Sequence, residues 1–211
     1  YKPNNMILCV VGNTDFNKIL RFAEENFGNE KGKVPSYSVS KKNETKIEKR
    51  KGIEQSNLVF SYHVPLANDS KSYVAEVLST LMAEGMSSRL FTEIREKRNL
   101  AYSINGDANI NKDFSYNLIK VGTTKENVEK VKELILEEFK KVADSLDEKE
   151  LNQVKEQIIG NYNISMEDSQ SQMVNLLTNE IFRKAEKFYE FEKNISNVKL
   201  EDVKKLAKIK D

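Results

Sequence analysis

The sequence contains a single cysteine, Cys9, and its longest uninterrupted apolar run extends only from Met6 to Val11. A lone cysteine excludes an internal disulfide bond and is typical of proteins from a reducing compartment. The apolar run is far shorter than the stretch that a bilayer-spanning helix needs. No basic-then-apolar leader pattern opens the sequence. We therefore expect a cytoplasmic protein without a membrane partner.

Histidine is equally scarce, because His63 is the only one in the sequence. Catalytic zinc is held by about three protein ligands, among which histidine is prominent, and no second histidine exists to join His63. A glycine-rich phosphate loop and a cysteine cluster are also missing, which argues against an unrelated small-ligand module. We expect neither a metal site nor a cofactor in this chain.

The sequence also lacks an excess of charge of either sign, with 34 Lys and Arg against 33 Asp and Glu. Its one basic stretch, residues 41–51, is interrupted by Glu44 and Glu48 and contains no interleaved aromatic residue. Nucleic-acid-binding proteins usually carry a concentrated basic surface. The composition therefore indicates an ordinary globular protein without a nucleic-acid partner.

The most informative pattern lies between residues 87 and 122. It begins with a predicted short helix, capped by Ser87 or Ser88 and buried along an apolar stripe formed by Leu90, Phe91 and Ile94. From Leu100 the pattern becomes a strand whose apolar side carries Tyr102, Ile104, Gly106, Ala108 and Ile110. Residues 111–113 form a turn, and 114–121 return as the second strand of a hairpin. Gly106 indicates a bulge or a close backbone approach.

Arg95 and Tyr102 flank the predicted helix-to-strand turn, seven residues apart. A guanidinium and a phenol are both hydrogen-bond donors, suited to gripping a carbonyl or carboxylate oxygen. The alternative is that Arg95 pairs with Glu93 or Glu96 at the surface and that Tyr102 is an ordinary sheet residue.

The chain before this region divides into two parts. Residues 1–30 form a terminal β-α unit, with a strand buried on both faces at 6–11 and a helix from Asp15 to Gly28. Residues 31–52 are rich in Lys, Glu, Ser and Asn, which predicts a polar linker.

Residues 53–211 form the predicted main domain. A half-buried strand at 58–64, which places His63 away from the apolar side, precedes a helix that starts at Asp69 or Ser70 and ends at Gly85. After the hairpin, capping patterns at Thr123 and Asp147 open two long helices, and further helices follow to residue 206. This order predicts an α+β fold in which helices pack on one face of a largely antiparallel sheet.

Several motifs resemble the C-terminal-half domain of the M16 zinc metallopeptidases, which include insulin-degrading enzyme and the mitochondrial processing peptidase. The resemblance is carried by Gln-Ser-Asn at 55–57, Val64-Pro65, Gly-Met-Ser-Ser-Arg-Leu-Phe at 85–91, and Arg95-Glu-Lys-Arg-Asn-Leu-Ala-Tyr102-Ser103. The opening Tyr1-x-Pro3-x-Asn5 and Val-Val-Gly12 resemble the last strand of the preceding M16 half.

The resemblance implies a function for Arg95 and Tyr102, because this half of the family contributes an arginine and a tyrosine at the same spacing. Tyr102 would stabilise the oxyanion during peptide hydrolysis, and Arg95 would bind the peptide substrate. The family's His-x-x-Glu-His motif belongs to the other half and is missing here. Zinc is therefore expected in a complementary half, and this chain alone should be inactive.

Two departures from the family pattern bear on the C-terminal end, and one alternative bears on function. Lys199 stands where the family usually has a capping Thr or Ser, and the sequence stops at Asp211 without the strand that normally follows. We therefore expect residues 6–11 to pair with the edge of the sheet in place of that strand, either in their own chain or swapped with a neighbouring copy. The functional alternative is a catalytically inactive M16-like scaffold or interaction subunit.

Overall fold

Three antiparallel strands form the sheet of the computed structural model, which describes residues 2–28, 32–35 and 37–208. The alternating pattern and the polar turn at 111–113 produce the predicted hairpin from β2 (Ala101–Ile110) and β3 (Ser115–Thr124). The strand β1 (Gln55–His63) pairs with the other side of β3. Within the described residues, β3 is thus the central strand, and β1 and β2 are the edges.

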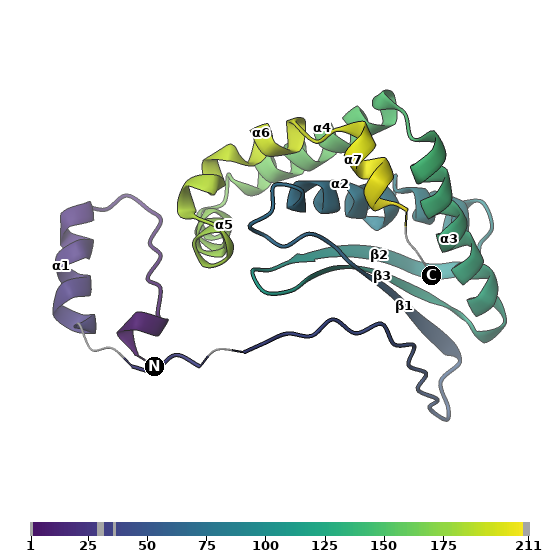
Figure 1. Ribbon diagram of the computed structural model, residues 1–211, viewed down its shortest axis with the longest axis horizontal. Helices are drawn as coiled ribbons and strands as arrows, with labels where there is room; N and C mark the ends of the chain where they lie inside the picture. Colours follow the sequence, from purple (N-terminus) through teal and green to yellow (C-terminus); the bar gives the residue numbers. More distant parts are fainter. Residues whose placement is uncertain (1, 29–31, 36, 209–211) are drawn as a thin grey trace.

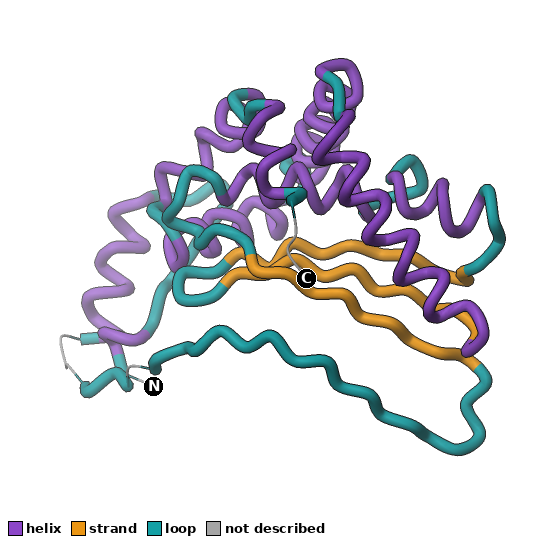
Figure 2. The backbone as a smooth tube through the Cα atoms, turned by 45° about the vertical axis from the view of Figure 1, so that its right-hand side comes forward, coloured by secondary structure: helices purple, strands orange, loops and turns teal. Residues whose placement is uncertain are grey.

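Helices after β1 gather on one face of this sheet, as both views of the molecule show (Figures 1 and 2). The longer ones are α2 (Ser72–Ala83), α3 (Val128–Ser145), α4 (Glu148–Ser165) and α5 (Ser169–Phe182). Shorter helices are η2 (Phe91–Glu96), η3 (Lys125–Asn127), η4 (Ala185–Glu190), α6 (Phe191–Ser196) and α7 (Leu200–Leu206). The α+β prediction, with helices on one face of an antiparallel sheet, is confirmed.

One hydrophobic core lies between the sheet and the helices. Leu78 and Met82 of α2, Ile119 of β3 and Ile135 of α3 are fully or almost fully buried in it. The ring of Tyr62 on β1 meets that of Phe139 on α3 edge-on, with the centroids 5.1 Å apart. His63, the next residue, is exposed, as the alternation of the strand predicts.

The predicted helix caps have mixed outcomes. Asp15 and Asp147 accept hydrogen bonds from the first backbone N–H groups of α1 (Phe16–Phe27) and α4, as predicted. The cap at Thr123 was a wrong prediction, because β3 extends through this residue and its hydroxyl donates to the carbonyl oxygen of Leu100. Lys199 gives α7 no side-chain cap, in agreement with the weak cap expected there.

The predicted strand at 6–11 is not formed, and the prediction that it pairs with the sheet of its own chain is wrong. These residues are extended but belong to no ladder, and Met6, Ile7, Leu8 and Val10 are about half exposed. A strand needs a neighbour for its backbone groups, and no described strand lies within pairing reach of this segment. Among the described residues, its one hydrogen bond to the main domain is a weak contact of 3.6 Å from the Cys9 Sγ to the carbonyl oxygen of Met173 on α5.

The N-terminal part contributes nothing to the described core. Neither the short turn η1 (Pro3–Asn5) nor α1 has a buried residue. The extended stretch before β1 has no helix or strand, and its described residues are almost all exposed. Residues 29–31 and 36 of this region, and 209–211 at the C-terminal end, lie outside the described residues. None of the described helices is both long and apolar enough to cross a bilayer.

Candidate functional site

The two predicted site residues flank the turn between η2 and β2, with Arg95 on the helix and Tyr102 on the strand. The helix η2 has π geometry, in which the backbone N–H of Lys97 donates to the carbonyl oxygen of Thr92 at 3.0 Å. The chain then reverses at Asn99, which has a φ of 52°, a left-handed conformation that asparagine tolerates. A hydrogen bond of 2.9 Å from the N–H of Leu100 to the carbonyl oxygen of Ile94 closes the turn. The predicted cap at Ser87 or Ser88 is not formed, because none of the hydrogen bonds of the described residues runs from a backbone N–H of the helix to either hydroxyl. The two hydroxyls donate to the side-chain oxygen of Gln157 and to the carbonyl oxygen of Gly85.

A β-bulge sets the direction of Tyr102. Ala101 pairs with Thr123 and Ser103 with Gly122, so that Tyr102 is an extra residue in β2. Ala101 and Ile104 are buried, whereas Tyr102 is 62% exposed. The prediction that Tyr102 shares the apolar side of the strand with Ile104 is therefore wrong, because the bulge interrupts the two-residue period. None of the hydrogen bonds among the described residues involves the Tyr102 hydroxyl.

Arg95 is exposed, and its guanidinium carbon lies 4.8 Å from the centroid of the Phe91 ring. This cation–π contact holds the side chain by its flat face and leaves its N–H groups free to donate at their edges. The expected surface partner Glu93 instead binds Lys97 and Arg98. Among the described residues no carboxylate forms an ion pair with Arg95, so the pairing with Glu93 or Glu96 is wrong.

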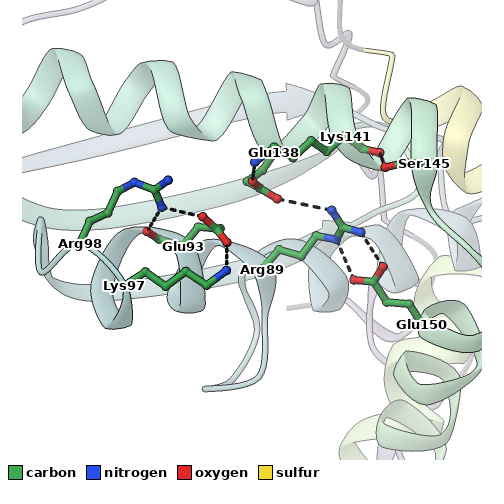
Figure 3. Close-up of polar contacts among 8 residues, drawn as sticks. All are labelled: Arg89, Glu93, Lys97, Arg98, Glu138, Lys141, Ser145 and Glu150. Carbon is green, nitrogen blue, oxygen red and sulfur yellow. Dashed lines mark hydrogen bonds and ion pairs between the residues drawn. The ribbon is translucent and has the colours of Figure 1, made fainter.

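A network of ion pairs connects the segment before η2 to the helices α3 and α4 (Figure 3). Arg89 donates to both carboxylate oxygens of Glu150 on α4, at 2.7 and 2.5 Å, and to Glu138 on α3 at 3.4 Å. Lys141 donates to the other oxygen of Glu138, whose side chain is only 3% exposed. The segment that leads into η2 is thus fixed to two long helices. Sequence reasoning missed Arg89 as a support, because its partners lie 49 and 61 residues away.

The ion pairs of Glu93 fix the end of the same helix. Its carboxylate accepts from Lys97 and Arg98, and these hydrogen bonds lower its pKa from 4.5 to about 2. Arg98 also donates to the backbone carbonyl oxygen of Glu93 at 2.7 Å. Lys97 and Arg98 are therefore bound within the protein, whereas Arg95 forms no ion pair among the described residues.

The described residues do not fit a catalytic zinc ion. They contain no group of three or more His, Cys, Asp or Glu side chains that could hold a metal, and His63 stands exposed on the edge strand β1. Since a catalytic zinc site needs about three such ligands, no step of the chemistry can be assigned to a metal in this part of the chain.

Comparison with known proteins identifies the family. Residues 1–158 match the model of the peptidase M16 inactive domain. A Bacillus subtilis protein named uncharacterized zinc protease YmxG is 28% identical, over 99% of this chain and 52% of its own length. A Rickettsia felis protein, also named an uncharacterized zinc protease, is 29% identical over 79% of this chain and 41% of its own. The chain spans about half the length of these curated relatives.

Solved structures show the same fold. A protease from Helicobacter pylori superposes with a TM-score of 0.76 at 19% identity, covering 93% of this chain and 50% of its own. A peptidase M16 inactive domain from Pseudomonas fluorescens superposes with a TM-score of 0.62 at 21% identity, covering 72% of this chain and 37% of its own. Together with the match to the family model, these similarities show that the chain belongs to the family of M16 peptidase inactive domains.

Proposed function

We propose that this chain is the substrate-binding, zinc-free half of an M16 metallopeptidase and supplies Arg95 and Tyr102 to a peptide-hydrolysis site. The metal that activates water would belong to a complementary half, in the same full-length chain or in a partner subunit. The observation that carries the proposal is the bulge that turns Tyr102 outward beside the turn that carries Arg95.

Tyr102 suits the stabilisation of an oxyanion. Burying a tyrosine in a sheet core normally lowers the free energy of the folded state, so a bulge that exposes its ring gives up that gain. The exposed phenol can donate a hydrogen bond to the oxygen on which negative charge develops during attack on a peptide bond. A donor that strengthens its hydrogen bond as this charge develops lowers the activation free energy.

Arg95 suits the binding of the peptide. Its guanidinium rests on Phe91, so part of its conformational entropy is lost before a ligand arrives. The planar fork of donors can then hold a backbone carbonyl or a carboxylate of the substrate with defined geometry. The ion pairs of Glu93 with Lys97 and Arg98 occupy one of the two carboxylates that η2 offers, and among the described residues the other, Glu96, forms no ion pair with Arg95.

We also propose that residues 1–30 belong to the preceding M16 half, that 31–52 are the linker, and that 53–211 form the inactive domain. The lack of buried residues in α1 and the exposed apolar side chains at 6–10 support this division. In this proposal, the segment at 6–11 pairs with strands of the complementary half. We place the assembled enzyme in the cytoplasm, on the basis of the single cysteine, and cell fractionation would test that location.

The experiment that tests the proposal uses the intact enzyme, or this chain assembled with its His-x-x-Glu-His half. Tyr102→Phe removes only the hydroxyl and should lower kcat by about 10²–10³ with little change in KM. Arg95→Ala should mainly raise KM. Tyr189→Phe and Arg50→Ala serve as matched controls, because both residues are exposed and lie far in the sequence from Tyr102 and Arg95. Unchanged kcat/KM in both site variants would contradict the proposal.

The second candidate function is an inactive scaffold or interaction subunit of M16 type. The family model that matches this chain describes an inactive domain, which is compatible with both candidates. The complementary half distinguishes them, because a scaffold pairs with a half that lacks His-x-x-Glu-His. In that case the assembled protein should show no chelator-sensitive hydrolysis of peptides.

A further inference from the structure

The face of the sheet opposite the helices carries a polar cluster that crosses all three strands (Figure 1). Ile104 and Val121 belong to the core beneath the helices, and the strand residues that alternate with them point to the other face. On that face, Gln55 of β1 and Ser103 of β2 are exposed, whereas Gly122 of the central strand β3 is buried. A glycine on a helix-free face is buried only if neighbouring side chains cover it.

Gln55 and Ser103 cover Gly122 from the two edge strands. A Cβ on Gly122 would overlap the Nε2 of Gln55 and would lie 2.8 Å from the Oγ of Ser103. Ser103 is the direct ladder neighbour of Gly122, whereas Gln55 pairs with Thr124 and reaches Gly122 along the diagonal, which a long side chain can span. The glycine therefore lets an amide and a hydroxyl converge over one point of the sheet.

These two converging groups have unused capacity for hydrogen bonds. Among the described residues, neither the Gln55 amide nor the Ser103 hydroxyl has a hydrogen-bond partner. A carboxamide offers N–H donors and an acceptor oxygen, and a hydroxyl is both a donor and an acceptor. The neighbours Asn57 and Asn105 on this face are neutral, and Lys120 is already in an ion pair. The cluster thus favours a neutral ligand with both a donor and an acceptor over an ion.

The cluster lies directly beside Tyr102. Tyr102 and Ser103 are both exposed and stand between the buried Ala101 and Ile104, so the bulge directs both side chains away from the core. Adjacent Cα atoms are about 3.8 Å apart, so a peptide that reaches the Tyr102 side chain also comes within reach of the cluster. A peptide group matches a carboxamide, because its C=O can accept from Nε2 while its N–H donates to Oε1.

We propose that Gln55 and Ser103 form a subsite that holds one backbone peptide group of the substrate, next to Tyr102 on the helix-free face of the sheet. This inference rests on the proposed function as a substrate-binding half and adds Gln55 and Ser103 to its substrate-binding residues. Because the peptide group is the same at every residue, the subsite positions the backbone and selects no side chain. A backbone held there fixes which carbonyl meets the Tyr102 phenol.

The first test measures peptide binding to the intact enzyme, with its zinc removed by a chelator so that the peptide is not cleaved. The probe is the uncharged, non-repeating peptide Thr-Ala-Phe-Val-Ser-Leu-Ala-Thr with a fluorescein label, and fluorescence anisotropy gives its Kd. Gln55→Ala should raise the Kd about tenfold, as expected for the loss of two neutral hydrogen bonds. Gln153→Ala removes an exposed glutamine of α4 and should leave the Kd unchanged.

Gly122→Ala tests the convergence of the two side chains. The new Cβ would displace the ends of the Gln55 and Ser103 side chains, which can rotate away. The backbone at Gly122 does not have the positive φ that disfavours alanine. This variant should therefore raise the Kd about as much as Gln55→Ala does, while its Tm stays close to that of the wild type.

Ester substitutions in the probe test whether Gln55 contacts the backbone directly. An ester at one position replaces a single peptide N–H by an oxygen, and a series of probes carries the ester at each position in turn. One position should raise the Kd of the wild type about fivefold, because Oε1 loses its donor. In Gln55→Ala the same ester should have no effect, since the partner of that N–H is already missing.

Three results would each overturn the inference. The first is wild-type affinity in Gln55→Ala or Gly122→Ala. The second is a series in which every ester has the same effect in the wild type and in Gln55→Ala, since Gln55 would then act only through the fold. The third is no binding of the probe up to its solubility limit.

These results are separable from those on Arg95→Ala and Tyr102→Phe. If both of those variants retain wild-type kcat/KM while one ester position still depends on Gln55, the catalytic proposal fails and the subsite stands. If Tyr102→Phe lowers kcat while no ester position depends on Gln55, the subsite alone fails.

Discussion

Arg89 donates one hydrogen bond to each carboxylate oxygen of Glu150 and so joins the segment before η2 to α4. This bidentate geometry is the strongest form of the arginine–carboxylate contact. The third bond, to the buried Glu138, makes the same arginine a link to α3. The position of η2, which carries Arg95, thus depends on a residue that forms no hydrogen bond or ion pair with Arg95 or Tyr102 among the described residues.

Arg89→Met should destabilise the fold by about 3 kcal/mol, because it leaves the buried carboxylate of Glu138 with Lys141 alone. Methionine replaces much of the apolar part of the arginine side chain, so the loss of stability reports mainly on the missing charge. The control is Lys130→Ala, which breaks an exposed pair with Glu133 and should cost less than about 1 kcal/mol. Urea unfolding measures both, and equal losses would contradict the supporting role of Arg89.

Glu93→Gln should reduce the dependence of the free energy of unfolding on pH in the acid range. The folded-state pKa of Glu93, about 2, lies below its ordinary value of 4.5. This carboxylate therefore contributes stability that is present above pH 4.5 and is lost as the pH falls through about 2. The free energy of unfolding of the wild type should drop over that window, and that of the variant should drop less. Glu156→Gln should retain the wild-type acid loss, and a wild-type slope in Glu93→Gln would count against the prediction.

Gly106→Ala should destabilise the protein by about 1–3 kcal/mol. The new Cβ would lie 2.9 Å from the Cβ of Ala83 and 3.2 Å from its carbonyl carbon, and neither atom can move without shifting α2. Gly160→Ala on α4 is the matched control, because no other atom lies within 4 Å of the Cβ that it would add. There, alanine should stabilise the helix by about 0.5–1 kcal/mol. Thermal unfolding of the two variants should therefore shift in opposite directions.

The isolated chain should bind no stoichiometric zinc after dialysis. His63 and Cys9 are single in the sequence, so a three-ligand site with histidine cannot be built from them. Elemental analysis gives the zinc content, and the assembled enzyme with its complementary half provides the positive control. A tight zinc site in this chain, with proteolysis that a chelator abolishes, would overturn the assignment of the two halves.

The elements with strong periodicity could be predicted from sequence, and the exceptions have local physical causes. The hairpin, α2 and α4 follow from alternating or helical apolar spacing and from the cap at Asp147. The outward direction of Tyr102 could not be predicted, because one extra residue in β2 reverses the phase and leaves no mark in composition. The segment at 6–11 has the residues of a buried strand, but strand formation depends on a neighbouring chain.

The site role of Arg95 and Tyr102 stays a prediction, whereas the contacts around these residues could not be predicted from the sequence. The residue types of Arg95 and Tyr102, together with the family resemblance, pointed to both. The long-range pairs of Arg89 and the use of Glu93 by Lys97 and Arg98 required coordinates, because every charged residue near the turn had several possible partners in sequence.

The π turn of η2 and the bulge of β2 together have a consequence for sequence alignment. Each accommodates one residue more than a regular helix or ladder would hold, and Asn99 lies between them. A relative with one residue fewer between 91 and 103 could retain both the arginine and the tyrosine in its sequence. Yet the deletion would rotate the arginine by about 100° around its helix or move the tyrosine to the other face of its sheet. The placement of single-residue gaps in this stretch therefore carries more information about inherited chemistry than the presence of the two residues.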